Sequence, residues 1–190
     1  MLRKIVLIIF LLSVPHLVLR AQDYGADSRQ KDRVKRGKQL VNEGRCEDCH
    51  TPLIETKGGL KPDSQRTLSG HPFDAEIPEV PKVEIDSQEW IKFLSTLDST
   101  LWAGEWGISF SANLTPDPMT GIGKWNEKIF IEAMRTGRHV DLKRDINPPM
   151  PWKDYAKLSD DDLGAIFAYL STLEPIHNTV PKPLPLPQEQ

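Results

Sequence analysis

The sequence predicts an all-α domain in which the helices are joined by long loops. Apolar residues recur at three- and four-residue spacing in several segments, as they do on one face of an amphipathic helix. No segment alternates apolar and polar residues convincingly as a half-buried strand does. Sixteen prolines and twelve glycines in 190 residues favour extended connections between the helices.

The composition places the chain among soluble globular domains. It holds 38% apolar and 27% charged residues, with a formal net charge of −3. These values exclude a multi-span membrane protein and a coiled coil. Nucleic acid is not an expected partner, because acidic residues outnumber basic ones.

Residues 1–21 have the layout of a secretory signal peptide. A basic start precedes the unbroken apolar run Ile5–Leu12, and the small residue Ala21 stands ahead of Gln22. We therefore expect export to the periplasm. An uncleaved anchor is the alternative, since the bulky Leu19 makes a poor cleavage context, and only then would a membrane be a partner. Cleavage leaves 21 basic and 27 acidic residues, a net charge of −6, which suits a partner with a basic patch.

The remaining chain divides into a domain over residues 22–174 and a tail. The first helix is expected within 22–45, where one face carries Val34, Gly37, Leu40, Val41 and Gly44.

A long ordered loop or insert is expected at about 52–110. It holds one short helix over 87–97, whose apolar side is expected to consist of Trp90, Ile91, Leu94 and Leu97.

Capping residues mark two later helices. Asn126 is expected to cap a helix that runs to Arg135 and ends at Gly137. Ser159 is expected to cap the clearest helix, over 160–173. Residues 175–190 then form a proline-rich extended tail.

The run Cys46-Glu47-Asp48-Cys49-His50 uses both cysteines of the chain. A CxxCH run is the attachment signature of c-type haem. Cysteines three apart project to one side of a helix, so each thiol can add to one haem vinyl group. His50 follows directly and is the expected proximal iron ligand. A thioredoxin-like pair would need a βαβ setting, and a structural zinc site would need further ligands.

The distal iron ligand must come from another part of the chain. Met150 is the preferred candidate, because a soft thioether on a proline-stiffened loop suits such a ligand. Met134 falls inside a predicted helix and is expected to be core, and Met119 lies in a turn-rich segment. His71 and His139 are rivals that would give bis-His ligation.

The chain resembles class I c-type cytochromes, and more narrowly the cytochrome c domains of periplasmic electron-transfer chains and dehydrogenase cytochrome subunits. The resemblance implies a cytochrome c fold, with helices wrapped around one covalently attached haem c and with His/Met ligation. It also implies that Gly37 meets Phe167 or Tyr169 where the first and last helices cross. The matching runs are 37–41 before Cys46–His50, Asn113–Asp117 with Thr120–Trp125, Ala133–His139, Pro149–Trp152 and Leu158–Leu173.

The expected function is that of an exported mono-haem carrier of single electrons, without bond chemistry on a substrate. Its partners would be redox proteins, with a dehydrogenase or quinol-oxidising donor and an oxidase or reductase acceptor. Two alternatives stay open. One is a haem-based sensor or peroxidase-like enzyme in which Met150 leaves the iron. The other is a haem-bearing docking subunit, whose 52–110 insert binds a larger dehydrogenase.

Overall fold

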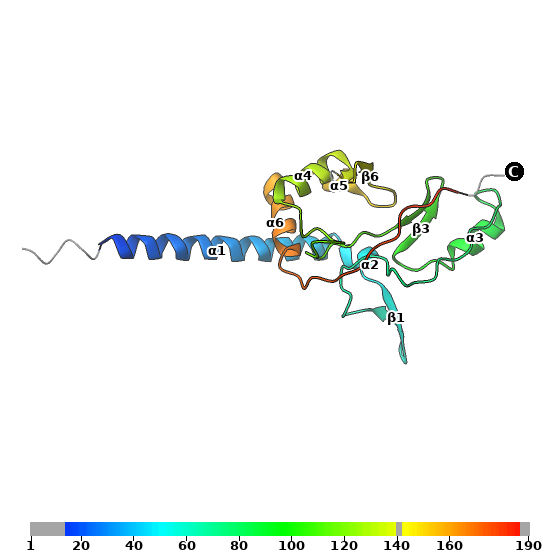
Figure 1. Ribbon diagram of the computed structural model, residues 1–190, viewed down its shortest axis with the longest axis horizontal. Helices are drawn as coiled ribbons and strands as arrows, with labels where there is room; N and C mark the ends of the chain where they lie inside the picture. Colours follow the sequence, from blue (N-terminus) through cyan, green and yellow to red (C-terminus); the bar gives the residue numbers. More distant parts are fainter. Residues whose placement is uncertain (1–13, 140–141, 187–190) are drawn as a thin grey trace, which may run out of the picture.

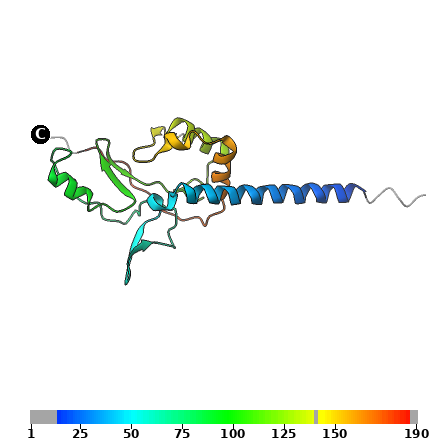
Figure 2. The same cartoon turned by 180° about the vertical axis from the view of Figure 1, so that it is seen from behind.

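The computed structural model describes residues 14–139 and 142–186, and their side chains from residue 27 onward. Most of the predicted signal peptide therefore lies outside the described residues. The first helix, α1, spans Val14–Glu43 and is continuous through the expected cleavage position. Its first half projects from the domain in both views (Figures 1 and 2). Within the described part of the chain, no helix combines the length and apolar character needed to cross a membrane.

The main core lies where α1 crosses the last helix, α6 (Asp160–Leu170). Gly37 of α1 sits against the Ala165 carbonyl and the Tyr169 side chain. The expected contact is therefore made with Tyr169, whereas Phe167 packs at a tilt against Phe130 of α4 (Glu127–Thr136), with 5.6 Å between the ring centroids. The buried members of this core are Leu40, Val41, Leu68, Ile122, Phe130, Leu163, Ile166 and Leu170.

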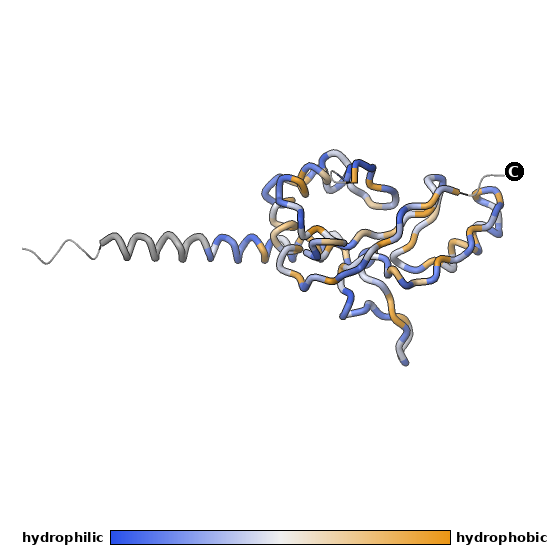
Figure 3. Tube along the Cα trace, viewed as in Figure 1, coloured by the Kyte–Doolittle hydropathy of each residue, from blue (hydrophilic) through white to orange (hydrophobic). Residues whose placement is uncertain are grey.

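The caps of α4 and α6 match those expected from the sequence. Asn126 accepts a hydrogen bond from the Ile129 amide, and Ser159 accepts one from the Asp162 amide. Gly137 ends α4 in the left-handed conformation. Figure 3 shows in blue the hydrophilic stretch of α1 that leads into this helical core.

The described chain is mostly helical, but it also contains three antiparallel two-stranded sheets. The expectation of an all-α domain is therefore confirmed only in part. The strands have only two to four residues, which is too short for an alternating pattern to stand out. The sheets pair β1 (Leu53–Thr56) with β2 (Gly59–Pro62), β3 (Leu101–Gly104) with β4 (Gly107–Phe110), and β5 (Arg138–His139) with β6 (Arg144–Asp145).

The insert at 52–110 is ordered and has a small core of its own. Its helix α3 (Gln88–Leu94) begins at the cap Ser87 and turns Trp90 and Phe93 inward, against Leu101 and Ile108. The expected apolar side of this helix was partly wrong, because Ile91 is 58% exposed and Leu94 is 37% exposed. The hairpin β1–β2 extends away from the rest of the domain (Figure 1).

The proline-rich tail is extended and packs onto the domain. It leaves α6, passes the loop at 115–120 and reaches β4, where Leu184 and Ile108 form two main-chain hydrogen bonds. Leu186 packs against the core of the insert. The tail thus connects the helical core to the insert.

Candidate haem attachment site

Two short helices complete the surroundings of the CxxCH run. The run itself forms α2 (Cys46–His50), and α5 (Trp152–Tyr155) follows Met150. Arg45 has a φ of 52°, a left-handed conformation that lets α2 begin shortly after α1 ends. Cys46 and Cys49 lie one turn apart, and both are free thiols. Burial raises the pKa of both thiols above the ordinary value for cysteine.

His50 is buried at the end of α2, and a main-chain carbonyl fixes its ring. The Nδ1 atom lies 2.8 Å from the Ala112 carbonyl oxygen, which can only accept a hydrogen bond. Nδ1 therefore carries the proton, and Nε2 keeps its lone pair for a metal. Burial lowers the pKa of His50, so the imidazole is neutral at pH 7.

The wall beside His50 is made by two segments that run side by side. The Gly70 amide donates to the His50 carbonyl at 2.8 Å, and the His71 amide donates to the Ser111 carbonyl at 3.0 Å. Gly70 has a φ of 78°, and a Cβ there would overlap the main chain of Ser111. Only glycine therefore permits this close approach next to the candidate iron ligand.

Met150 is half-buried in a loop that is fastened at both ends. On one side, the Ser109 hydroxyl of β4 donates to the Pro148 carbonyl at 2.6 Å. On the other side, the Tyr155 hydroxyl of α5 donates to the Gly44 carbonyl at 3.1 Å and lies 3.9 Å from the Cys46 sulfur. The loop with Met150 is thus held by the insert and by the segment that carries the first thiol.

The other candidate ligands have different surroundings. Met119 is 71% exposed, and Met134 packs against the main core. His139 lies with its ring centroid 6.1 Å from that of Trp125. His71 is fully buried, and its Nδ1 atom lies 2.8 Å from the Thr100 hydroxyl.

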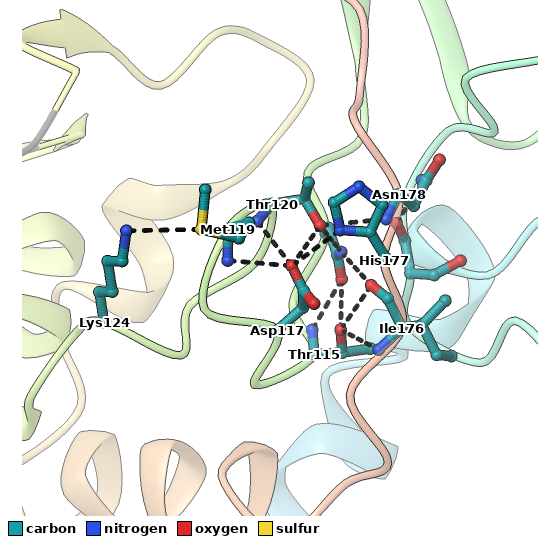
Figure 4. Close-up of polar contacts among 10 residues, drawn as sticks. Thr115, Asp117, Met119, Thr120, Lys124, Ile176, His177 and Asn178 are labelled. Carbon is teal, nitrogen blue, oxygen red and sulfur yellow. Dashed lines mark hydrogen bonds and ion pairs between the residues drawn. The ribbon is translucent and has the colours of Figure 1, made fainter.

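The loop at 113–120, part of the run that carries the family resemblance, holds the tail (Figure 4). Asp117 accepts hydrogen bonds from the Met119 amide at 3.0 Å and from the Thr120 amide and hydroxyl, both at 2.7 Å. The Thr120 hydroxyl oxygen accepts a hydrogen bond from the main-chain amide of Asn178 at 3.0 Å. The Thr120 hydrogen bonds lower the pKa of Asp117, which is therefore ionised at pH 7.

The thiols of Cys46 and Cys49 and the imidazole of His50 fit a c-type haem. Two thiols stand one turn apart, and a neutral imidazole with an available Nε2 follows them on the same helix. The Ala112 carbonyl is a functional group that the sequence did not reveal, because every residue has a carbonyl. The hydrogen bonds from Ser109 to the Pro148 carbonyl and from Tyr155 to the Gly44 carbonyl were not expected from the sequence either.

Comparison with known proteins points in the same direction. No protein-family model matches the chain. The chain is 30% identical over 162 residues to the gluconate 2-dehydrogenase cytochrome c subunit of Pantoea cypripedii, which is 83% of the chain and 27% of that subunit. It is 41% identical over 63 residues to the cytochrome c subunit of the quinone alcohol dehydrogenase of Gluconobacter oxydans, covering 33% of the chain and 13% of the subunit.

A third relative is the fructose dehydrogenase cytochrome subunit of Gluconobacter japonicus, with 34% identity over 98 residues, or 47% of the chain and 20% of that protein. The chain thus spans less than a third of the length of each of these three relatives. The match to the Pantoea protein extends over most of the present chain, so it includes more than a short motif.

Proposed function

Because the chain carries a c-type cytochrome domain of the kind found in dehydrogenase cytochrome subunits, we propose that it is a mono-haem carrier of single electrons. The observation that carries the proposal is the state of His50. Its Nδ1 proton is engaged by Ala112, and its Nε2 lone pair is left for iron, directly after two free thiols. Bound haem c would supply an iron that takes up and releases one electron.

Each part of the chain has a separate task in this proposal. Cys46 and Cys49 would hold the haem through thioether bonds, and His50 would be its proximal ligand. Met150 would supply the distal ligand. Its loop is fastened through Pro148 and Tyr155, which would keep the thioether in one place. We propose that the chain itself carries electrons and is not an enzyme, since its relatives are named as cytochrome subunits of dehydrogenases.

The proposed location is the periplasm, reached through the signal peptide at 1–21. The proposed donor is a dehydrogenase subunit, since the relatives are named as cytochrome subunits of gluconate, alcohol and fructose dehydrogenases. The docking-subunit alternative is favoured by the insert at 52–110. It has its own core, and its helix α3 keeps Ile91 and Leu94 exposed. Co-purification of an untagged dehydrogenase with the tagged chain would support docking, provided that a variant lacking the insert's helix loses it.

The decisive experiment is a reduced-minus-oxidised visible spectrum of the chain matured together with a c-haem assembly system. We expect the bands of a c-type haem and haem staining that survives denaturing electrophoresis. Cys46→Ala or Cys49→Ala alone should weaken the covalent attachment, and the double variant should lose it. Haem that remains bound to the double variant under denaturing conditions would contradict the proposal.

A further inference from the structure

Ser111 is held by a closed set of hydrogen bonds one residue before the carbonyl that orients His50. Its amide donates to the Thr100 carbonyl at 2.9 Å, and its own carbonyl accepts from the His71 amide at 3.0 Å. The His71 side chain closes the triangle, because its Nδ1 atom lies 2.8 Å from the Thr100 hydroxyl oxygen. His71, Thr100 and Ser111 are all buried, so solvent does not compete for these bonds.

The direction of the side-chain bond follows from the neighbouring acid. The Thr100 hydroxyl donates to Asp98 at 2.7 Å, so its oxygen accepts a hydrogen bond from the protonated His71 Nδ1. His71 Nε2 is buried without a hydrogen-bond partner among the described residues. Burial lowers the pKa of His71, which keeps the ring neutral. The ring is also packed on Phe110, with 4.9 Å between the ring centroids.

His71 therefore connects three parts of the chain at one point. Its ring contacts Phe110 and Thr100, and its amide holds Ser111. Ala112 is the next residue, and its carbonyl oxygen accepts a hydrogen bond from His50 Nδ1 at 2.8 Å. A partner that accepts a proton from a metal-bound imidazole makes the imidazole a stronger ligand, so its position affects the metal.

We propose that His71, through its hydrogen bond to Thr100, is a positioning residue that sets the Ala112–His50 hydrogen bond and thereby the reduction potential of the iron. The inference rests on the proposed function, in which His50 is the proximal ligand. When the triangle opens, the Ala112 carbonyl moves away from Nδ1. His50 then becomes a weaker donor, and ferric iron is less well stabilised. The potential consequently rises.

The test compares variants of the full chain carrying covalent haem, by spectroelectrochemical titration. Thr100→Val removes the acceptor and leaves His71 in place, and we expect a higher midpoint potential. His71→Phe keeps a ring on Phe110 without the donor, and we expect a rise of similar size. His71→Asn retains an N–H close to the position of Nδ1 and should restore a midpoint potential near that of the unmodified chain.

The matched control is Thr96→Val, which removes another hydroxyl of the insert, one that donates to the Phe93 carbonyl at 2.7 Å. Its potential should stay at that of the unmodified chain. The double variant His71→Phe with Thr100→Val should move the potential no further than either single change, because both remove the same bond. If the two changes only loosened the insert in general, their shifts of the midpoint potential would add in the double variant. Shifts that do not add therefore identify the specific His71–Thr100 bond.

Three results would overturn the proposal. The potential could stay unchanged in Thr100→Val and His71→Phe, or it could shift equally in Thr96→Val. The axial-ligand absorption could also change in the His71 variants alone, which would make His71 an iron ligand. All three results leave the proposed electron carrier standing if covalent haem is present, although the third would replace Met150 as the distal ligand. A chain that matures without covalent haem overturns both proposals.

Discussion

A single main-chain carbonyl decides which nitrogen of His50 is available to a metal. The Ala112 oxygen accepts a hydrogen bond from the protonated Nδ1, and burial lowers the pKa of the ring. A histidine in the same motif without such a partner would exchange its proton between both nitrogens. At the scale of single residues, the site is therefore defined as much by the acceptor as by the histidine.

Met150→Ala tests the proposed distal ligand. We expect loss of the thioether-to-iron absorption of the ferric protein and a lower reduction potential, because a soft ligand that favours ferrous iron is removed. The iron should also become open to carbon monoxide. Visible spectra with and without carbon monoxide, together with a potentiometric titration, measure these effects.

The control changes are Met119→Ala and Met134→Ala. Met119 is largely exposed and should be silent. Met134 is only partly buried against the core, so Met134→Ala should cost less than the roughly 2–5 kcal/mol of unfolding free energy typical of a fully buried methionine, without a change of ligand. The assignment to Met150 is reversed if its variant keeps the thioether band while Met119→Ala loses it. A spectrum altered only by His71→Ala or His139→Ala would instead indicate bis-His ligation.

At the scale of elements, the crossing of α1 and α6 depends on Gly37. A Cβ at this position would overlap the Ala165 carbonyl oxygen and lie 2.8 Å from the Tyr169 Cβ. Gly37→Ala must therefore push the two helices apart, although alanine favours the helix itself. We expect a loss of about 1–3 kcal/mol in the free energy of unfolding, measured by denaturant titration. Gly58→Ala is the control, since its Cβ would meet nothing closer than 3.8 Å. Equal stability of the two variants would disprove the close crossing.

The same pair of helices is joined by an ion pair that titrates. The Arg36 side chain donates to Asp162 at 2.8 Å, and this bond holds the pKa of Asp162 below its usual range. Because the folded pKa is the lower one, the ion pair stabilises the fold above the ordinary carboxyl pKa of about 4. The stabilisation is lost as the pH falls through the folded pKa.

Asp162→Asn should therefore lower the free energy of unfolding at pH 7 by the small amount typical of exposed ion pairs. In acid, the variant and the unmodified chain should be equally stable. Thermal unfolding measured from neutral pH down into strong acid tests this. Asp161→Asn, which keeps the Arg36–Asp162 pair, should not show the same pH-dependent difference. A difference for Asp162→Asn that grows in acid would contradict the sign.

The longer helices α1, α4 and α6 were predictable from local chemistry, whereas the short helix α5 and the hairpins were not. Asn126 and Ser159 reveal α4 and α6 because each cap bonds an amide three residues further along the sequence. The strand pair β3–β4 depends instead on Gly107, which has a φ of 95° and lies against the main chain of Leu184 in the tail. Such a distant contact leaves no periodic pattern. For the site, the thiols and His50 are visible as a motif, but their partner Ala112 is not.

At the scale of the whole molecule, Asn178 is the point where the tail meets the wall of the site. It is 5% exposed, and its amide group donates to the carbonyls of Ser69 and His71 at 2.7 and 2.9 Å. Its side-chain oxygen accepts from the Phe73 amide at 3.0 Å. Asn178→Ala leaves these three main-chain groups without their hydrogen-bond partner, so it should lower the free energy of unfolding by about 1–3 kcal/mol.

The measurement is thermal unfolding combined with limited proteolysis of the tail. Asn178→Ala should unfold at lower temperature and be cut after residue 175 earlier than the unmodified chain. The exposed Asn42 of α1 supplies the control, because Asn42→Ala should change neither property. A tail that is cut equally fast in all three proteins would mean that Asn178 does not fasten it.

The position of the tail also sets an order of events as the chain is made. The thiols of α2 leave the ribosome long before Ala112, whose carbonyl holds a ring 62 positions earlier, and Asn178 follows its partner His71 by 107 positions. In a nascent chain, Cys46 and Cys49 are therefore already made while the wall beside His50, which includes Ser111 and Ala112, has not yet formed. The wall is fastened only after Asn178 has been made, so a product truncated before Asn178 would keep the attachment motif but lack this fastening.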